Sequence, residues 1–146
     1  MALYLGLYIR SEYYMKNAIV VGIMAGFVCG LVFYVLVNMG LNMEIPLLNP
    51  RGDLPTYAPL EFTHGIIWGI IFSSIYAFFY DYIPGKGIKK GLIYGFMLWT
   101  IAILRIGALG ASHGGAEWAL SYTFVNIFTI FIPYSLILGY LYKPPK

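Results

Sequence analysis

Long runs without charge are the feature of this sequence that most restricts its fold. No Asp, Glu, Lys or Arg occurs between Lys16 and Glu44, and none occurs from Phe62 to Tyr80. A helix needs about 20 apolar residues to cross the roughly 30 Å hydrocarbon core of a bilayer. Because both runs are long enough, the sequence predicts that they span a membrane.

The overall composition agrees with a lipid environment. Hydrophobic residues make up 60% of the 146 residues and charged residues 10%, whereas soluble proteins carry about 25% charged residues. A chain of this length is too short to enclose so large an apolar fraction in a water-soluble core. Backbone N–H and C=O groups must be paired within lipid, so the predicted spans are helices.

We predict a single membrane domain, 1–146, with four transmembrane helices. The predicted spans are about 18–40, 61–81, 88–107 and 117–142. Residues 1–16 are expected to lie at the membrane interface, where tyrosine rings collect. Residues 41–60 contain four prolines and are expected to form a loop of turns. Pro133 lacks an N–H and is expected to bend the fourth span.

The positions of the basic residues predict the orientation. Seven of the nine Lys and Arg occur near the chain ends and around the turn between the second and third spans, at positions 10, 16, 86, 89, 90, 143 and 146. Such residues remain in the cytoplasm. The sequence thus predicts an all-α integral membrane protein of the cell membrane, a four-helix bundle with both termini cytoplasmic. It lacks the dense basic stripe of nucleic-acid-binding domains, so no nucleic-acid partner is expected.

Small residues recur every four positions in three of the predicted spans. The glycines in these repeats are Gly22, Gly26, Gly30, Gly65, Gly69, Gly91 and Gly95. This spacing places small residues on one helix face, where two backbones can approach closely. We expect the repeats to pack helices of the same chain, with an interface between copies as the alternative. The similar repeats in the first and third spans suggest a duplicated helical hairpin.

Titratable residues gather at the predicted outer end. Glu61 and His64 are three residues apart at the start of the second span and therefore share a helix face. His113 and Glu117 are four residues apart at the start of the fourth span, and Arg105 lies near the end of the third. These three span ends lie on the same side of the membrane. The five side chains are therefore expected to be able to converge.

Two interpretations of this outer cluster remain open. Two carboxylates and two imidazoles are a ligand set for Zn or another divalent metal, and His64 and His113 are a weaker candidate pair for haem. Alternatively, Glu61 and Glu117 occupy first helical turns, where negative charge suits the helix dipole. Arg105 is then expected to form a structural ion pair or polar site. No catalytic residue is assigned.

A resemblance covers residues 62–100. His64 stands at the start of a span and is followed by glycines, and a Pro84-Gly85 turn leads into a further glycine-rich span. This pattern resembles the YagU-like uncharacterised small inner-membrane proteins. The resemblance implies a helical inner-membrane protein and no established reaction. The four-proline loop departs from that pattern.

Three functional hypotheses follow from the sequence. The first is a non-catalytic integral membrane subunit that packs or stabilises a larger complex, such as a respiratory or transport assembly. Its partners are the lipid bilayer and other membrane subunits or a second copy of itself. The second is a metal- or haem-binding membrane protein that uses the outer cluster. The third is a small homo-oligomeric transporter or channel. Because no acidic residue lies deep in a predicted span, we favour the first and do not expect an enzyme.

Overall fold

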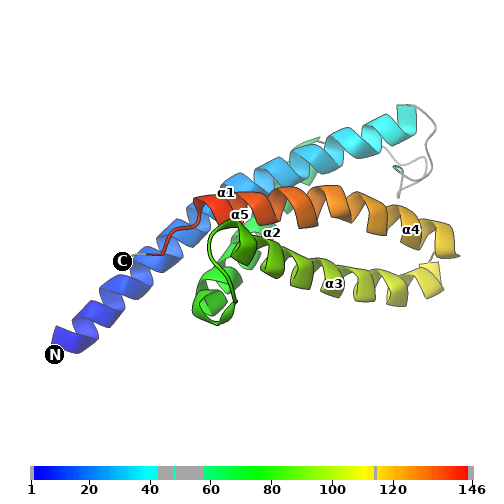
Figure 1. Ribbon diagram of the computed structural model, residues 1–146. Helices are drawn as coiled ribbons and strands as arrows, with labels where there is room; N and C mark the ends of the chain where they lie inside the picture. Colours follow the sequence, from blue (N-terminus) through cyan, green and yellow to red (C-terminus); the bar gives the residue numbers. More distant parts are fainter. Residues whose placement is uncertain (1, 43–47, 49–57, 114, 145–146) are drawn as a thin grey trace.

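The computed structural model describes residues 2–42, 48, 58–113 and 115–144, which are helical apart from short turns (Figure 1). The described residues include no β-strand, so the prediction of an all-helical chain is confirmed. The elements are α1 (Ala2–Asn42), α2 (Ala58–Phe79), the 3₁₀ helix η2 (Tyr80–Tyr82), α3 (Ile88–His113), α4 (Gly115–Asn126), the π-helix η3 (Ile127–Tyr134) and α5 (Ser135–Leu141).

Three stretches are long and apolar enough to cross a membrane. They are Met15–Gly40, Ala58–Tyr82 and Ala119–Leu141, and they overlap the first, second and fourth predicted spans. Among the residues whose side chains are described, α3 does not join this group. The described side chains of α3 extend only as far as Ile106. This part of α3 includes three charged residues, Lys89, Lys90 and Arg105.

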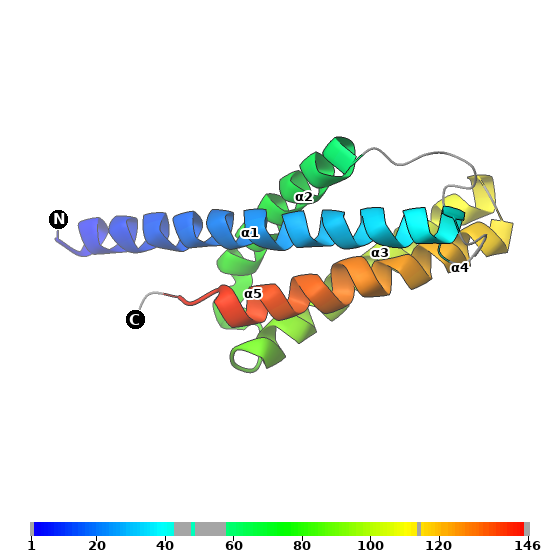
Figure 2. The same ribbon diagram turned by 90° about the horizontal axis from the view of Figure 1, so that it is seen from above.

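Two helix boundaries differ from the predicted ones. Residues 1–16 were expected to lie at the membrane interface before a span that begins near residue 18, and α1 is one helix from Ala2 to Asn42 that includes both. The interfacial placement of residues 1–16 stays a prediction. The N-terminal turns of α1 continue in line beyond the rest of the molecule (Figures 1 and 2). Similarly, α3 continues past residue 107 to His113. A continued helix keeps backbone groups paired near lipid. Gly115 then begins α4 with a φ of 71°, a left-handed conformation that glycine adopts readily.

The helices form two hairpins that pack against each other. In the first, α1 packs on α2, and in the second, α3 packs on α4, η3 and α5. Figure 2 shows α2 crossing α1 obliquely, while α3 runs beside the rod formed by the last three elements. Contacts of α1 with η3 and α5 join the two hairpins. This arrangement agrees with the two hairpins suggested by the glycine repeats.

Pro133 lies in a π-helical segment rather than at a sharp bend. The π-helix η3 connects α4 to α5 in one nearly continuous rod (Figure 2). Pro133 has no N–H to give to the helix ladder, and a local π adjustment allows the freed carbonyl groups to find other donors. The hydroxyl of Thr129 donates to the carbonyl of Val125 at 3.1 Å.

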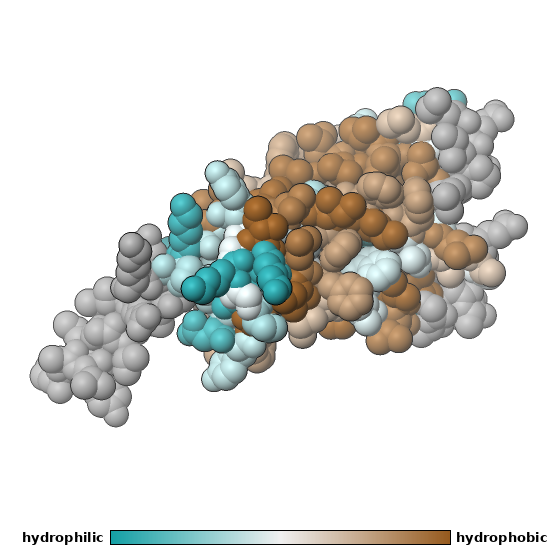
Figure 3. Space-filling model, in the orientation of Figure 1, coloured by the Kyte–Doolittle hydropathy of each residue, from teal (hydrophilic) through white to brown (hydrophobic). Residues whose placement is uncertain are grey.

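Polar residues gather at one end of the molecule. The side-chain amide of Asn17 donates to the carbonyl oxygen of Lys143 at 2.9 Å, so α1 meets the segment after α5 there. Hydrophilic residues concentrate in this region of the face shown in Figure 3, and hydrophobic residues cover most of the remaining described surface in view. We call it the lysine end, and it carries Lys16, Lys86, Lys89, Lys90 and Lys143. The opposite end, called the far end, carries Glu61, His64 and Arg105.

Candidate functional site

The glycine repeat of α1 lies directly against the backbone of α2. A Cβ atom added to Gly26 would overlap the carbonyl oxygen of Gly65, and one added to Gly69 would overlap the carbonyl oxygen of Gly22. At Gly30, an added Cβ would lie 2.7 Å from the carbonyl oxygen of Glu61. The two helices therefore approach each other more closely than any side chain larger than hydrogen allows.

The second hairpin has a similar seam. A Cβ atom added to Gly91 would overlap the carbonyl oxygen of Ser135 and would lie 2.6 Å from the Cα of Gly139. One added to Gly95 would overlap the Ser135 hydroxyl. In both hairpins the repeat glycines thus occupy contacts between helices of the same chain.

At the far end, Glu61 and His64 lie in different environments. Glu61 is 5% exposed, whereas His64 is exposed. The indole N–H of Trp68 donates to Nε2 of His64, and the two rings lie 6.2 Å apart. One ring nitrogen of His64 is therefore engaged by the next turn of α2.

The other predicted members of the outer cluster are only partly described. Arg105 is exposed on α3, His113 is the last residue of α3, and Glu117 lies in the first turn of α4. The side chains of His113 and Glu117 lie outside the described set. Among the side chains that are described, no three His, Cys, Asp or Glu form a possible metal site. The metal site, the haem site and the ion pair of Arg105 stay predictions.

An apolar pocket of about 350 Å³ lies between α3 and α4. Among the described side chains, a single polar one lines it, and the described lining residues are Ile103, Ile106, Ala116, Ala119, Leu120 and Thr123. This lining offers dispersion contacts to an apolar chain. The described part of this lining supplies one hydroxyl and no ionisable group.

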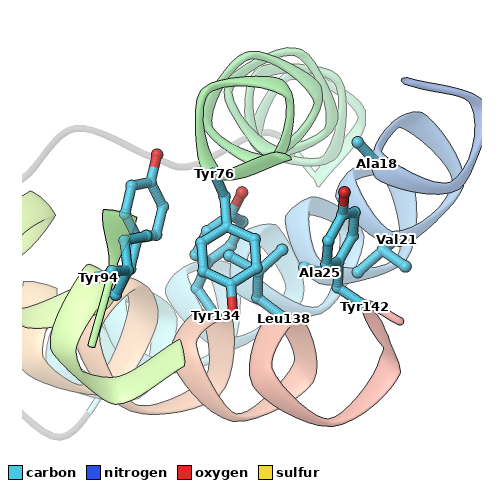
Figure 4. Packing of buried hydrophobic residues seen from close by; sticks show 9 residues of the cluster. Ala18, Val21, Ala25, Tyr76, Tyr94, Tyr134, Leu138 and Tyr142 are labelled. Atoms are coloured by element: carbon cyan, nitrogen blue, oxygen red, sulfur yellow. The ribbon is translucent and has the colours of Figure 1, made fainter. Parts of the chain in front are cut away.

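Aromatic rings fill the interior near the lysine end. Tyr76 is 1% exposed, and its ring centroid lies 5.0 to 5.4 Å from three other tyrosine rings. Figure 4 shows Tyr76 beneath α2 with Tyr134 and Leu138, and the ring of Tyr142 next to the labelled residues of α1. We call this group the tyrosine cluster, and it consists of Tyr76, Tyr80, Tyr94, Tyr134 and Tyr142.

Hydroxyl groups tie the other helices to the backbone of α2 and α1. The phenol of Tyr94 on α3 donates to the carbonyl of Phe72 at 2.7 Å. The phenol of Tyr134 in η3 donates to the carbonyl of Gly69 at 3.0 Å. Ser73 on α2 donates to the carbonyl of Ala18 on α1 at 2.7 Å. These bonds satisfy buried hydroxyls and link helices across the interior.

Lys90 is buried and bonded to η2, the 3₁₀ turn that directly follows α2. It is 7% exposed, and its ammonium group donates to the carbonyl of Tyr80 at 2.5 Å. The same nitrogen lies 3.8 Å from the centroid of the Tyr80 ring. A cation is favourable at a helix C-terminus and over an aromatic face. The other four lysines of this end are exposed.

Sequence reasoning did not find the tyrosine cluster or the burial of Lys90. The only local signal was the spacing of Tyr76 and Tyr80, four residues apart on one helix face. Their partners come from α3, η3 and the segment after α5. Lys90 was grouped with the other cytoplasmic lysines. Its contact with Tyr80 depends on how α3 packs against the preceding helix, which the local sequence does not show.

Comparison with known proteins adds no assignment. No protein-family model matches the chain, and neither the curated proteins nor the solved structures give a match. The resemblance to YagU-like proteins therefore stays a prediction.

Proposed function

We propose that the protein is a non-catalytic, multi-pass subunit of the cell membrane that packs against or stabilises other membrane proteins. It crosses the bilayer four times, with the lysine end and both chain termini in the cytoplasm. The observation that carries this proposal is the use of the interior polar groups: buried hydroxyls and Lys90 bind backbone carbonyls and hold the helices together.

The outward surface supports placement among lipids or partner helices. Large apolar side chains are exposed along the described parts of α1, α2 and α3, including Val20, Phe27, Leu31, Leu60, Ile67, Phe96, Ile101 and Leu104. Soluble monomers rarely expose apolar patches beyond a few hundred Å². Lipid chains and the helices of a partner are both suited to such a surface.

The interior supports a structural role. The hydroxyls of Thr129 and Ser135 donate to carbonyls four residues earlier along the rod formed by α4, η3 and α5, and that of Ser73 bridges α2 and α1. Groups used in this way stabilise helix packing and are already bonded. A transport path instead needs polar groups directed toward a solute.

The geometry of α3 supports a fourth crossing. Its 26 residues correspond to about 39 Å at 1.5 Å per residue, more than the roughly 30 Å of hydrocarbon. It runs beside the rod formed by α4, η3 and α5 (Figure 2). Four crossings place the start of α1 and the end of α5 on one side, in agreement with the contact between Asn17 and Lys143.

Extraction from membranes in a mild detergent tests the proposed role. The tagged full-length chain should elute in a complex with at least one other membrane protein at a fixed ratio, as measured by mass spectrometry of the intact complex. A matched sample in a harsh detergent should release the chain as a monomer. A stable monomer in the mild detergent would contradict the proposal, and a multiple of the chain's own mass would favour the homo-oligomeric transporter.

A further inference from the structure

Exposed lysines from separate parts of the chain meet at the lysine end. Lys86 lies in the turn before α3, Lys89 in the first turn of α3, and Lys143 after α5, and all three are exposed. The turn and α5 are adjacent, because a Cβ atom added to Gly139 would lie 2.8 Å from the Cα of Ile88. The fold therefore brings these three cations to one end of the molecule.

The turn before α3 presents its lysines in a defined way. Gly85 and Gly87 have φ angles of 100° and 51°, which glycine adopts without strain. They place Lys86 at the tip of a tight turn. The stem of Lys89 lies against the same turn, because its Cγ would be 3.2 Å from a Cβ added to Gly85.

The charge of this surface is mostly positive. Among the described side chains at the lysine end, Asp81 is the single acidic residue. Lys90 is buried and donates to the carbonyl of Tyr80. The remaining lysines face outward, so the surface attracts anions.

Toward the lysine end, the exposed residues change from apolar to aromatic with a hydroxyl to charged, which is the order of hydrocarbon, interface and headgroups in a bilayer. Phe78 and Phe79 near the end of α2 are exposed apolar rings, suited to acyl chains. Tyr82 and Tyr140 are 83% and 69% exposed, and tyrosine prefers the interface between hydrocarbon and water. The lysines follow next to them in the chain. This order favours a membrane lipid over a soluble anion as the ligand.

We propose that Lys86, Lys89 and Lys143 bind the phosphate groups of anionic phospholipids in the leaflet at the lysine end. This inference rests on the membrane placement proposed above and does not depend on the subunit role. Basic residues next to a membrane are attracted to anionic lipids. Each of the three ammonium groups donates hydrogen bonds to headgroup oxygens, while Tyr82 and Tyr140 contact the glycerol region.

Native mass spectrometry of the purified full-length protein in neutral detergent tests this inference. Phosphatidylglycerol should bind more tightly than phosphatidylcholine. The triple variant K86Q/K89Q/K143Q should bind phosphatidylglycerol at least about tenfold more weakly, given about fivefold per lysine, with phosphatidylcholine binding unchanged. Arg105→Gln removes one exposed cation from the far end and is the matched control. It should change phosphatidylglycerol binding less than about twofold, since that site lies beyond the Debye length.

Three results would overturn the inference. They are equal binding of the two lipids by the wild type, unchanged phosphatidylglycerol binding by a triple variant with the wild-type unfolding temperature, and an equal loss in Arg105→Gln. Inorganic phosphate that displaces phosphatidylglycerol at millimolar concentration would identify a site for free phosphate instead. Because the isolated chain is used, failure to find a protein partner leaves this result unaffected.

Discussion

The lysine end and the far end of the molecule are held together in different ways. At the lysine end, the tyrosine cluster joins α2, η2, α3, η3 and the segment after α5, and the phenols of Tyr94 and Tyr134 donate to backbone carbonyls of α2. At the far end, α3 and α4 leave an apolar pocket between them. Buried hydroxyls and large rings thus join the helices at the lysine end, whereas the contact of α3 with α4 around the pocket is apolar.

A pair of leucines gives the largest expected contrast between the two ends. Leu138 is fully buried beside the tyrosine cluster, whereas Leu120 is mostly exposed at the pocket. Leu138→Ala should lower the free energy of unfolding by about 3 kcal/mol, because it leaves a cavity. Leu120→Ala should lower it by less than about 0.5 kcal/mol. Unfolding by SDS titration in mixed micelles measures both, and equal losses would break the comparison.

The glycine seam should show the next largest effect. Gly26→Ala forces α1 away from the Gly65 carbonyl and should cost about 2 kcal/mol in the same titration. Alanine favours an isolated helix by about 1 kcal/mol over glycine. Helix propensity alone would therefore make Gly26→Ala stabilising, whereas the contact with α2 should make it destabilising. Gly95→Ala meets the Ser135 hydroxyl, which can turn aside, and the Ser135 Cβ at 2.8 Å, while the nearest backbone atom is 3.3 Å away. It should therefore cost less than Gly26→Ala. A stabilised Gly26→Ala variant would show that the two helices are farther apart.

Substitutions of the neighbouring residues Lys90 and Lys89 compare a buried lysine with an exposed one at the lysine end. Lys90→Met removes the cation from the end of α2 and from the Tyr80 ring, and it should cost about 1 to 1.5 kcal/mol. Lys89→Met changes an exposed lysine and should stay within about 0.5 kcal/mol. Thermal unfolding in detergent distinguishes the two, and the reverse order would place the wrong lysine in the interior.

The phenol bonds should make a smaller contribution. Tyr134→Phe keeps the ring and removes the hydroxyl that donates to Gly69, so a loss of about 0.6 to 1 kcal/mol is expected, as for other hydrogen bonds between membrane helices. Tyr140→Phe alters an exposed tyrosine and serves as the control. If the two variants unfold at the same temperature, the bond to Gly69 does not stabilise the lysine end.

The smallest expected effect is at His64. His64→Ala removes an exposed side chain that accepts the Trp68 indole N–H, and stability should change by less than about 0.5 kcal/mol. Because Glu61 is buried and His64 is exposed, we also expect the metal content of the purified protein to stay the same. Elemental analysis showing one divalent metal per chain that is lost in His64→Ala would instead support the predicted outer cluster.

The features that could be predicted depend on residues close together in the sequence. Charge-free runs indicate helices because lipid leaves the backbone no other partner. The four-residue spacing of Gly22, Gly26 and Gly30 indicates a close helix contact because it repeats on one face. The helix ends were harder to place. The first span was bounded by the charge at Lys16 and the third by the length of one crossing, yet α1 begins before residue 16 and α3 continues past residue 107.

Features that depend on distant residues were not predictable. Tyr76 packs with Tyr142, which is far away in the sequence, and fourteen tyrosines allow many such pairs. Tyrosine also collects at membrane interfaces, so its presence alone does not indicate burial. At the far end, the spacing of Glu61 and His64 placed them on neighbouring positions of α2 but did not show that only one of them is buried.

Labelling of single cysteines in intact cells tests the central claim most directly. In a Cys29→Ala background, a membrane-impermeant maleimide should react with Lys86→Cys and Lys143→Cys only after the cells are opened. Thr56→Cys and Ser112→Cys should react in intact cells, because four crossings place both at the outer surface. Labelling of Lys86→Cys in intact cells, or protection of Ser112→Cys together with Lys86→Cys, would contradict this arrangement.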